Sequence, residues 1–133
     1  AKLTYRYKKG EKSFAFTETP VFEKVGTMLD VSRNAVMNLP TVKFMMRKMA
    51  LMGMNAFMLY TEDTYEIEGY PYFGHLRGRY TAEELRILDD YADALGIELI
   101  PCIQTLAHLN AIFNWTLTVL ADRPRCSAIS DEL

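Results

Sequence analysis

Polar side chains that could do chemistry follow apolar, strand-like segments at three places in this chain. They are Arg33, the adjacent pair Glu62 and Asp63, and His108. Because right-handed crossovers make successive strands of an α/β chain parallel neighbours, we expect these groups to share one edge of a sheet. A planar guanidinium holds two hydroxyls or one carboxylate, and carboxylates beside it accept hydrogen bonds from hydroxyls. The set therefore suits a polyol better than an anion.

Each of these residues also has a purely structural interpretation. Arg33 could pair with Asp30 or Asp63 only to organise the edge, and Glu62 with Asp63 could be a solvated loop start. A lone histidine such as His108 is more often a structural hydrogen-bonding group than a general base. The residue types leave both interpretations open.

Three strands are expected to position these groups, at residues 25–31, 54–60 and 97–103. The second is apolar almost throughout, which is typical of a parallel strand buried on both faces. A loop rich in aromatic residues, glycine and proline covers residues 64–80, which is long for a compact domain and suggests function. Within it we expect a solvated or partner-facing edge, formed by His75, Arg77 and Arg79. Aromatic side chains around the loop suit sugar stacking or a subunit interface; they are Tyr60, Tyr65, Tyr70, Tyr72, Phe73 and Tyr80.

Two helices are expected between the strands. The first opens at Asn38, with Pro40 in its first turn, and ends at Gly53. Thr81 and Glu84 form a capping box that opens the second, which Gly96 ends. Apolar residues at helical spacing predict the buried faces; they are Val42, Met45, Met46, Met49 and Met52 in the first helix, and Leu85, Leu88, Ala92 and Leu95 in the second.

The predicted fold class is α/β, a partial TIM-type (β/α) barrel of about three β/α units preceded by a β-hairpin. The hairpin occupies residues 1–20, the partial barrel 21–115, and a divergent C-terminal tail 116–133. An eightfold barrel needs about 250 residues, so we expect a fragment.

The composition of the chain limits the classes of binding partner that we expect. With a formal charge of −2 and no basic stripe, the chain is not expected to bind nucleic acid. No apolar run approaches the roughly 20 residues of a membrane span, and no signal peptide is recognisable. Cys102 and Cys126 form neither a disulfide framework nor a CxxC motif, and His75 and His108 lack metal-ligand spacing. We therefore expect no metal or other cofactor, and a cytoplasmic rather than secreted protein.

Between about residues 22 and 115 the chain resembles the opening of the catalytic barrel of family 20 glycoside hydrolases, the β-N-acetylhexosaminidases. Four motifs carry the resemblance: MLDVSRN (28–34), LYTEDTYEIEGYPYFG (59–74), RGRYT (77–81) and IPCIQTLAHL (100–109). Two departures suggest a subgroup. Leu106-Ala107 stands where Pro-Gly often precedes the histidine, and Met58-Leu59-Tyr60 replaces a common His-x-His.

The resemblance implies roles for individual residues. Arg33 would bind hydroxyls of the terminal sugar, Glu62 and Asp63 would correspond to the strand-two carboxylate segment, and His108 to the histidine after strand three. The ligand would be a glycan containing N-acetylhexosamine. The family's mechanism is substrate-assisted, with an Asp-Glu pair at the end of the fourth strand.

Asp131 and Glu132 form the only Asp-Glu dipeptide, but we do not expect them to be that catalytic pair. They follow no convincing buried strand, lack the preceding glycine of the family and come too soon after the third strand. The chain is therefore expected to be inactive alone. The alternative is a non-catalytic carbohydrate-binding or self-assembling β/α module, and uncovered strand edges favour a homo-oligomer.

Overall fold

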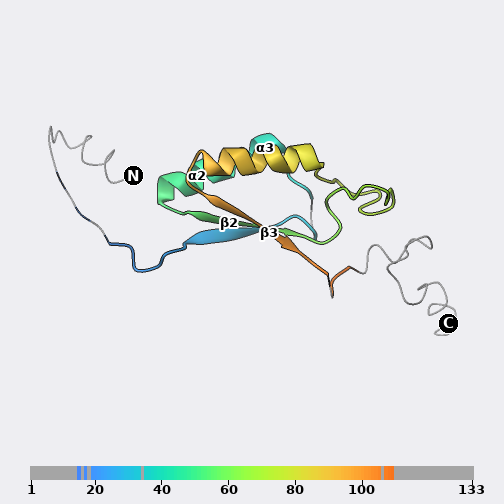
Figure 1. Cartoon of the computed structure of the whole chain (residues 1–133), viewed down its shortest axis with the longest axis horizontal. Helices are drawn as coiled ribbons and strands as arrows, with labels where there is room; N and C mark the ends of the chain where they lie inside the picture. Colours follow the sequence, from blue (N-terminus) through green and yellow to red (C-terminus); the bar gives the residue numbers. More distant parts are fainter. Residues whose placement is uncertain (1–14, 16, 18, 34, 106, 110–133) are drawn as a thin grey trace.

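Three parallel strands in one sheet, in the order β1-β2-β3, form the centre of the structure. It is a computed structural model that describes residues 15, 17, 19–33, 35–105 and 107–109. Both helices lie against the same face of the sheet (Figure 1). In chain order the elements are β1 (Gly26–Asp30), α2 (Leu39–Met52), β2 (Ala56–Thr61), α3 (Ala82–Asp93) and β3 (Glu98–Ile103). The described residues thus confirm an α/β arrangement of the expected order.

Local signals define the two helices. The Asn38 side chain accepts a hydrogen bond from the Thr41 backbone N–H at 3.1 Å and caps α2, which ends at Gly53 with a left-handed φ of 82°. At α3 the Thr81 hydroxyl accepts from Glu84 N–H while the Glu84 carboxylate accepts from Thr81 N–H, both at 3.0 Å. The expected caps at Asn38, Gly53 and Thr81 are confirmed, because each depends only on neighbours in sequence. The second helix ends earlier than expected, at Asp93 with Ala94 as its C-cap, so Leu95 and Gly96 lie beyond it.

The hydrophobic core lies between the helices and one face of the sheet. It is formed by Leu29, Val31, Val42, Met46, Met49, Phe57, Leu59, Tyr80, Leu88, Ala92 and Ile97. The predicted stripe of α2 was wrong at Met52, which is 63% exposed in the last turn of the helix. Helical spacing indicates which side of the helix faces the sheet. It does not indicate how far along the helix the sheet extends.

The other face of the sheet carries apolar side chains with no helix over them among the described residues. Met28, Met58 and Ile100 are register partners and form one row, and Asp30, Tyr60 and Cys102 form the next row toward the carboxyl ends. We call this surface the open face. The expectation that the second strand is buried on both faces was wrong for the described residues, since Met58 is 41% exposed.

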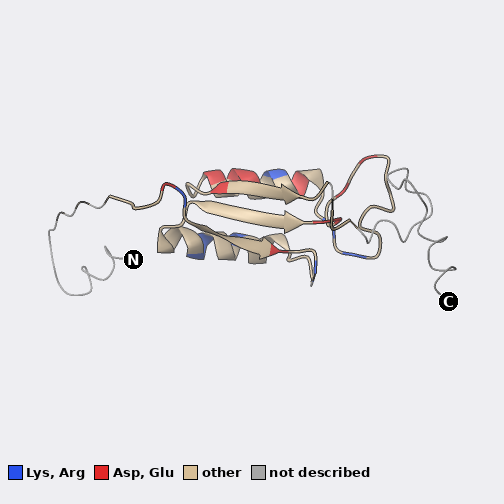
Figure 2. Cartoon of the chain, turned by 90° about the horizontal axis from the view of Figure 1, so that it is seen from below, with Lys and Arg blue, Asp and Glu red and all other residues tan. Residues whose placement is uncertain are grey.

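Most of the charged residues lie outside the strands of the sheet. In Figure 2 acidic and basic residues gather on the two helices and on the segments that follow the carboxyl ends of the strands. Within the described part of the chain, no helix is long and apolar enough to cross a membrane.

Some expectations fall outside the described residues. They include most of the hairpin at 1–20, all of the tail at 116–133, and Asp131 with Glu132. The proposed domain boundaries therefore stay predictions.

Candidate functional site

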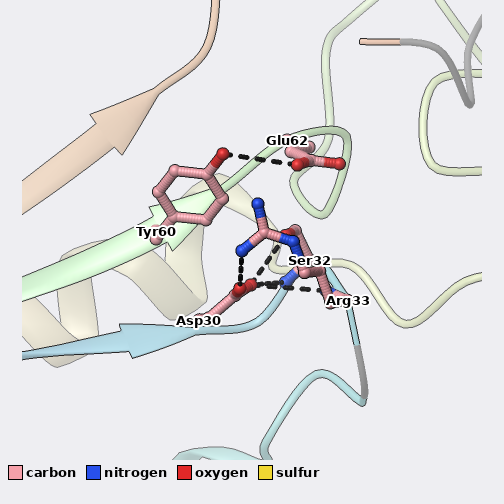
Figure 3. A network of polar contacts seen from close by, with 5 residues as sticks. All are labelled: Asp30, Ser32, Arg33, Tyr60 and Glu62. Carbon is pink, nitrogen blue, oxygen red and sulfur yellow. Dashed lines mark hydrogen bonds and ion pairs between the residues drawn. The ribbon is translucent and has the colours of Figure 1, made fainter. Parts of the chain in front are cut away.

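The carboxylate of Asp30 organises the turn that follows β1. Its Oδ1 accepts hydrogen bonds from Ser32 N–H at 2.8 Å, from the Ser32 hydroxyl at 2.6 Å and from Arg33 N–H at 3.3 Å. Its Oδ2 accepts from Arg33 Nη1 at 2.5 Å (Figure 3). An aspartate that binds backbone groups two and three residues ahead closes a tight turn. The turn therefore fixes where the Arg33 side chain starts and where its guanidinium lies.

These bonds also set the charge of the pair. The Ser32 hydroxyl, with help from the Ser32 and Arg33 backbone N–H groups and the Arg33 side chain, lowers the pKa of Asp30 to about 2 against the opposing effect of burial. Its hydrogen bond to Asp30 raises the pKa of Arg33. Both groups are therefore ionised at neutral pH.

Tyr60 connects this pair to the next strand. It is the register partner of Asp30, so its ring lies beside the turn on the open face. The Arg33 guanidinium carbon lies 5.4 Å from the centre of the ring, within the range of a cation–π contact. The Tyr60 hydroxyl donates to Glu62 Oε1 at 3.3 Å (Figure 3). Arg33, Tyr60 and Glu62 thus form one continuous polar group.

Asp63 has a different environment from Glu62, although the two are adjacent. Its side chain is only 3% exposed, and Nη1 of Arg77 lies 2.8 Å from its Oδ1. That oxygen accepts no hydrogen bond within the described structure, so the contact is an ion pair. The buried hydroxyls of Thr61 and Thr64 also have no hydrogen-bond partner within the described structure. A charged pair therefore anchors the long loop to the end of β2.

The loop at 64–80 is folded onto itself. Arg79 donates to the carbonyl of Phe73 at 2.7 Å and to that of Pro71 at 3.3 Å. The backbone of Tyr80 donates to the Thr64 carbonyl at 3.0 Å. The expectation of a solvated or partner-facing edge was wrong for Arg77 and Arg79, because their guanidinium groups bind the loop and the end of β2.

Tyr80 closes the loop. Its buried hydroxyl donates to the Met37 carbonyl at 2.6 Å, and burial raises its pKa to about 12. Gly74 of the loop has a φ of 66°, and a Cβ there would lie 2.2 Å from the Asp63 carbonyl oxygen. The close approach of the loop to β2 thus requires glycine at this position.

His108 lies apart from the other predicted site residues. It is exposed, it follows β3 by several residues, and its φ of 62° is in the left-handed region. Among the described residues, no hydrogen bond or ion pair joins it to Arg33, Glu62 or Asp63. The structure brings Arg33 and Glu62 together, places Asp63 next to them in the core, and leaves His108 outside this group.

Sequence reasoning missed three neighbours of the candidate site residues. It gave Tyr60 no contact with Arg33 or Glu62, did not single out Ser32, and assigned Arg77 to the surface. Strand alternation could have found Tyr60, since it places residues 58 and 60 on the same face. No group of three His, Cys, Asp or Glu in the described part of the chain could hold a metal ion.

The arrangement can bind a neutral ligand rich in hydroxyls. Arg33 has a planar fork with five donors and is 61% exposed, so donors remain directed toward solvent after Asp30 is bound. Glu62 presents acceptors on the same side of the sheet. An anionic ligand would be attracted by Arg33 but repelled by the carboxylates of Asp30 and Glu62.

Parallel strands joined by helices, with polar residues gathered beyond their carboxyl ends, define an α/β protein of the kind that binds ligands at that edge. The sequence profile described as "Glycosyl hydrolase family 20, catalytic domain" matches residues 22–130. The chain therefore belongs to glycosyl hydrolase family 20. The match continues past Trp115, where the tail was expected to begin. A comparison with curated proteins gives no match.

Solved structures of this family have the same fold in this region. A Streptomyces plicatus β-hexosaminidase mutant in complex with its product GlcNAc is 25% identical with a TM-score of 0.65, covering 72% of this chain and 22% of that one. The β-N-acetylhexosaminidase from Bacteroides fragilis is 27% identical with a TM-score of 0.64, and the match covers 71% of this chain and 22% of that one. The exo β-N-acetylglucosaminidase from Vibrio harveyi, in complex with N-acetylglucosamine, is 27% identical with a TM-score of 0.57, and the match covers 63% of this chain and 17% of that one. The chain thus spans about a fifth of the length of these relatives.

Proposed function

We propose that these residues form the first sugar-facing part of a glycoside hydrolase that removes terminal β-linked N-acetylhexosamine with retention of configuration. The observation that carries the proposal is the group of Arg33, Tyr60 and Glu62 beyond β1 and β2, in a chain of this family. A fixed donor fork beside a fixed carboxylate matches the paired donors and acceptors of adjacent sugar hydroxyls.

In this proposal the residues have separate tasks. Arg33 donates to hydroxyls of the terminal sugar, and Glu62 accepts from a neighbouring hydroxyl. Asp63 belongs to the same subsite, with its carboxylate held by Arg77. His108 is the remaining candidate for sugar contact and would have to approach from the segment after β3.

The chemical step would be substrate-assisted. The oxygen of the 2-acetamido group attacks the anomeric carbon of its own sugar as the glycosidic bond breaks, and a carboxylic acid protonates the leaving oxygen. Water then opens the cyclic intermediate, so the product keeps its configuration. We propose that these 133 residues lack the Asp-Glu pair that orients the amide and supplies the proton. On its own the chain then binds sugar without hydrolysing it.

Two assays on the same protein test this function. We expect the 133-residue chain to bind N-acetylglucosamine saturably, and to hydrolyse an aryl β-N-acetylglucosaminide no faster than background. Arg33→Ala should abolish binding. Arg86→Ala, which removes an exposed arginine paired with Glu83 on α3, is the matched control and should bind normally.

Two results would contradict the proposal in different ways. Equal binding by the Arg33→Ala variant would refute the sugar site. Turnover well above background that disappears in Arg33→Ala would refute inactivity, and it would give Asp131 and Glu132 or an oligomer a role in supplying the acid.

A second candidate function is self-assembly through the sheet, in a non-catalytic module. It is favoured by the open face, where Met28 and Met58 are both exposed among apolar neighbours. Exposed apolar surface on a sheet is a common site of association. Light scattering should then show a homo-oligomer, and Met58→Lys should reduce its mass; a monomer at high concentration would exclude this candidate.

A further inference from the structure

Tyr60 occupies a central position at the sheet edge. It belongs to β2, with Asp30 of β1 and Cys102 of β3 as its register partners, so strands on both sides fix its backbone. The preceding residue, Leu59, is buried against the helices, and alternation therefore turns the Tyr60 ring to the open face. The ring thus starts from one of the most constrained parts of the described sheet.

Two contacts join this tyrosine to the two residues proposed to bind sugar. Its ring supports the Arg33 guanidinium at 5.4 Å from the ring centre, and its hydroxyl donates to Glu62 at 3.3 Å. Arg33 and Glu62 both lie in segments that follow strands, outside the ladder of the sheet. The tyrosine therefore transmits the rigidity of β2 to both of them.

We propose that Tyr60 is a positioning residue for the sugar subsite, holding the Arg33 fork with its ring and the Glu62 carboxylate with its hydroxyl. This inference rests on the proposed function. The ligand of this subsite is a neutral sugar with adjacent free hydroxyls. Arg33 presents hydrogen-bond donors to one hydroxyl, and Glu62 presents an acceptor to the neighbouring one. Asp30 and Glu62 would repel a sugar phosphate or a uronic acid.

The charges around the phenol are consistent with this role. Burial and the nearby Glu62 carboxylate raise the pKa of Tyr60, while Arg33 opposes them and Asp30 adds to them. The phenol therefore keeps its proton at neutral pH and remains a donor to Glu62.

Two substitutions separate the two contacts. Tyr60→Phe keeps the ring under Arg33 and removes the donor to Glu62, whereas Tyr60→Leu removes both. Tyr91 offers a matched control on the helices: its hydroxyl accepts from Arg47 at 2.9 Å, and Lys43 lies 5.0 Å from its ring centre. Tyr91→Phe thus makes the same chemical change away from the sheet edge.

Nuclear magnetic resonance of the full chain gives the readout. We expect Tyr60→Phe to shift the Glu62 carboxyl carbon signal and leave the Arg33 Nε–H signal in place, with N-acetylglucosamine affinity reduced about three- to tenfold. Tyr60→Leu should shift both signals and weaken binding further, and Tyr91→Phe should change neither. Unchanged Glu62 and Arg33 signals in a folded Tyr60→Phe and Tyr60→Leu pair would overturn the proposal, as would unchanged affinity in both.

The outcomes also distinguish this inference from the function on which it rests. If the unsubstituted chain binds no N-acetylglucosamine, the proposed function fails, and the two side-chain signals still decide whether Tyr60 holds Arg33 and Glu62. If Tyr60→Leu does not fold, Tyr60→Phe with its Glu62 signal and its affinity decides alone.

Discussion

Two arginine–aspartate pairs lie at the carboxyl ends of neighbouring strands of the same sheet and differ sharply in exposure. In the pair after β1, Arg33 is 61% and Asp30 26% exposed; in the pair after β2, Arg77 is 28% and Asp63 3% exposed. The first is local in sequence and leaves its arginine accessible. The second joins a distant loop to the sheet. The same kind of ion pair therefore leaves an arginine accessible in one place and anchors a loop in the other.

The largest expected loss of stability follows from breaking the buried pair, Arg77 with Asp63. Removing one partner of a buried ion pair leaves the other charge uncompensated, so Arg77→Ala should lower the free energy of unfolding by about 3 kcal/mol. Arg33→Ala should change it by less than about 1 kcal/mol, because exposed pairs contribute little. Urea unfolding measures both. Equal losses of unfolding free energy in the two variants would contradict the claim that only the Arg77 pair stabilises the fold substantially.

Gly74 tests how closely the loop must approach β2. Gly74→Ala would place a Cβ 2.2 Å from the Asp63 carbonyl oxygen at a left-handed φ, whereas Gly69 has a left-handed φ of 82° with nothing near its Cβ position. Gly69→Ala should cost about 1 kcal/mol for the conformation alone. Thermal unfolding should show a clearly larger loss for Gly74→Ala, and similar losses would mean that the loop is not closely packed there.

Acid should act on the exposed pair through Asp30. Its pKa is lowered from 3.8 to about 2 in the folded chain, so its contribution to stability is complete above about pH 4 and is lost as the pH falls toward 2. The Arg33 Nε–H signal should move over the same range. Ser32→Ala removes the largest cause of the shift and should move this transition to higher pH; an unchanged transition would contradict the assigned cause.

A small loss of stability is also expected at the cap that follows the loop. Thr81→Ala removes the hydroxyl that accepts from Glu84 N–H and should cost about 1 kcal/mol of stability. Sugar binding should not change, since the hydrogen bonds of the cap join only Thr81 and Glu84. Loss of binding in a stable Thr81→Ala variant would show that the loop and the Arg33 group are coupled.

What the sequence could predict was mostly local. Asn38, Gly53, Thr81 and Glu84 act on neighbours a few residues away, so the helix ends were readable from spacing alone. Alternation and apolar runs likewise placed the strands. Four sequence motifs were enough to indicate the correct family.

The site was predictable in part, because its remaining features depend on contacts between distant segments. Arg77 reaches Asp63 only after a loop has turned back on the sheet. The contact between Tyr60 and Arg33 depends on the pairing of Tyr60 with Asp30, a register that no local signal specifies. Likewise, the exposure of Met58 depends on what covers the sheet and not on the composition of β2.

The most direct test is a titration of the chain with N-acetylglucosamine, followed by nuclear magnetic resonance of the arginine Nε–H groups. We expect the Arg33 signal to move and saturate while the Arg77 signal stays, because the first arginine would face the ligand and the second holds a loop. An Arg33 signal that never moves, or an Arg77 signal that moves equally, would contradict it.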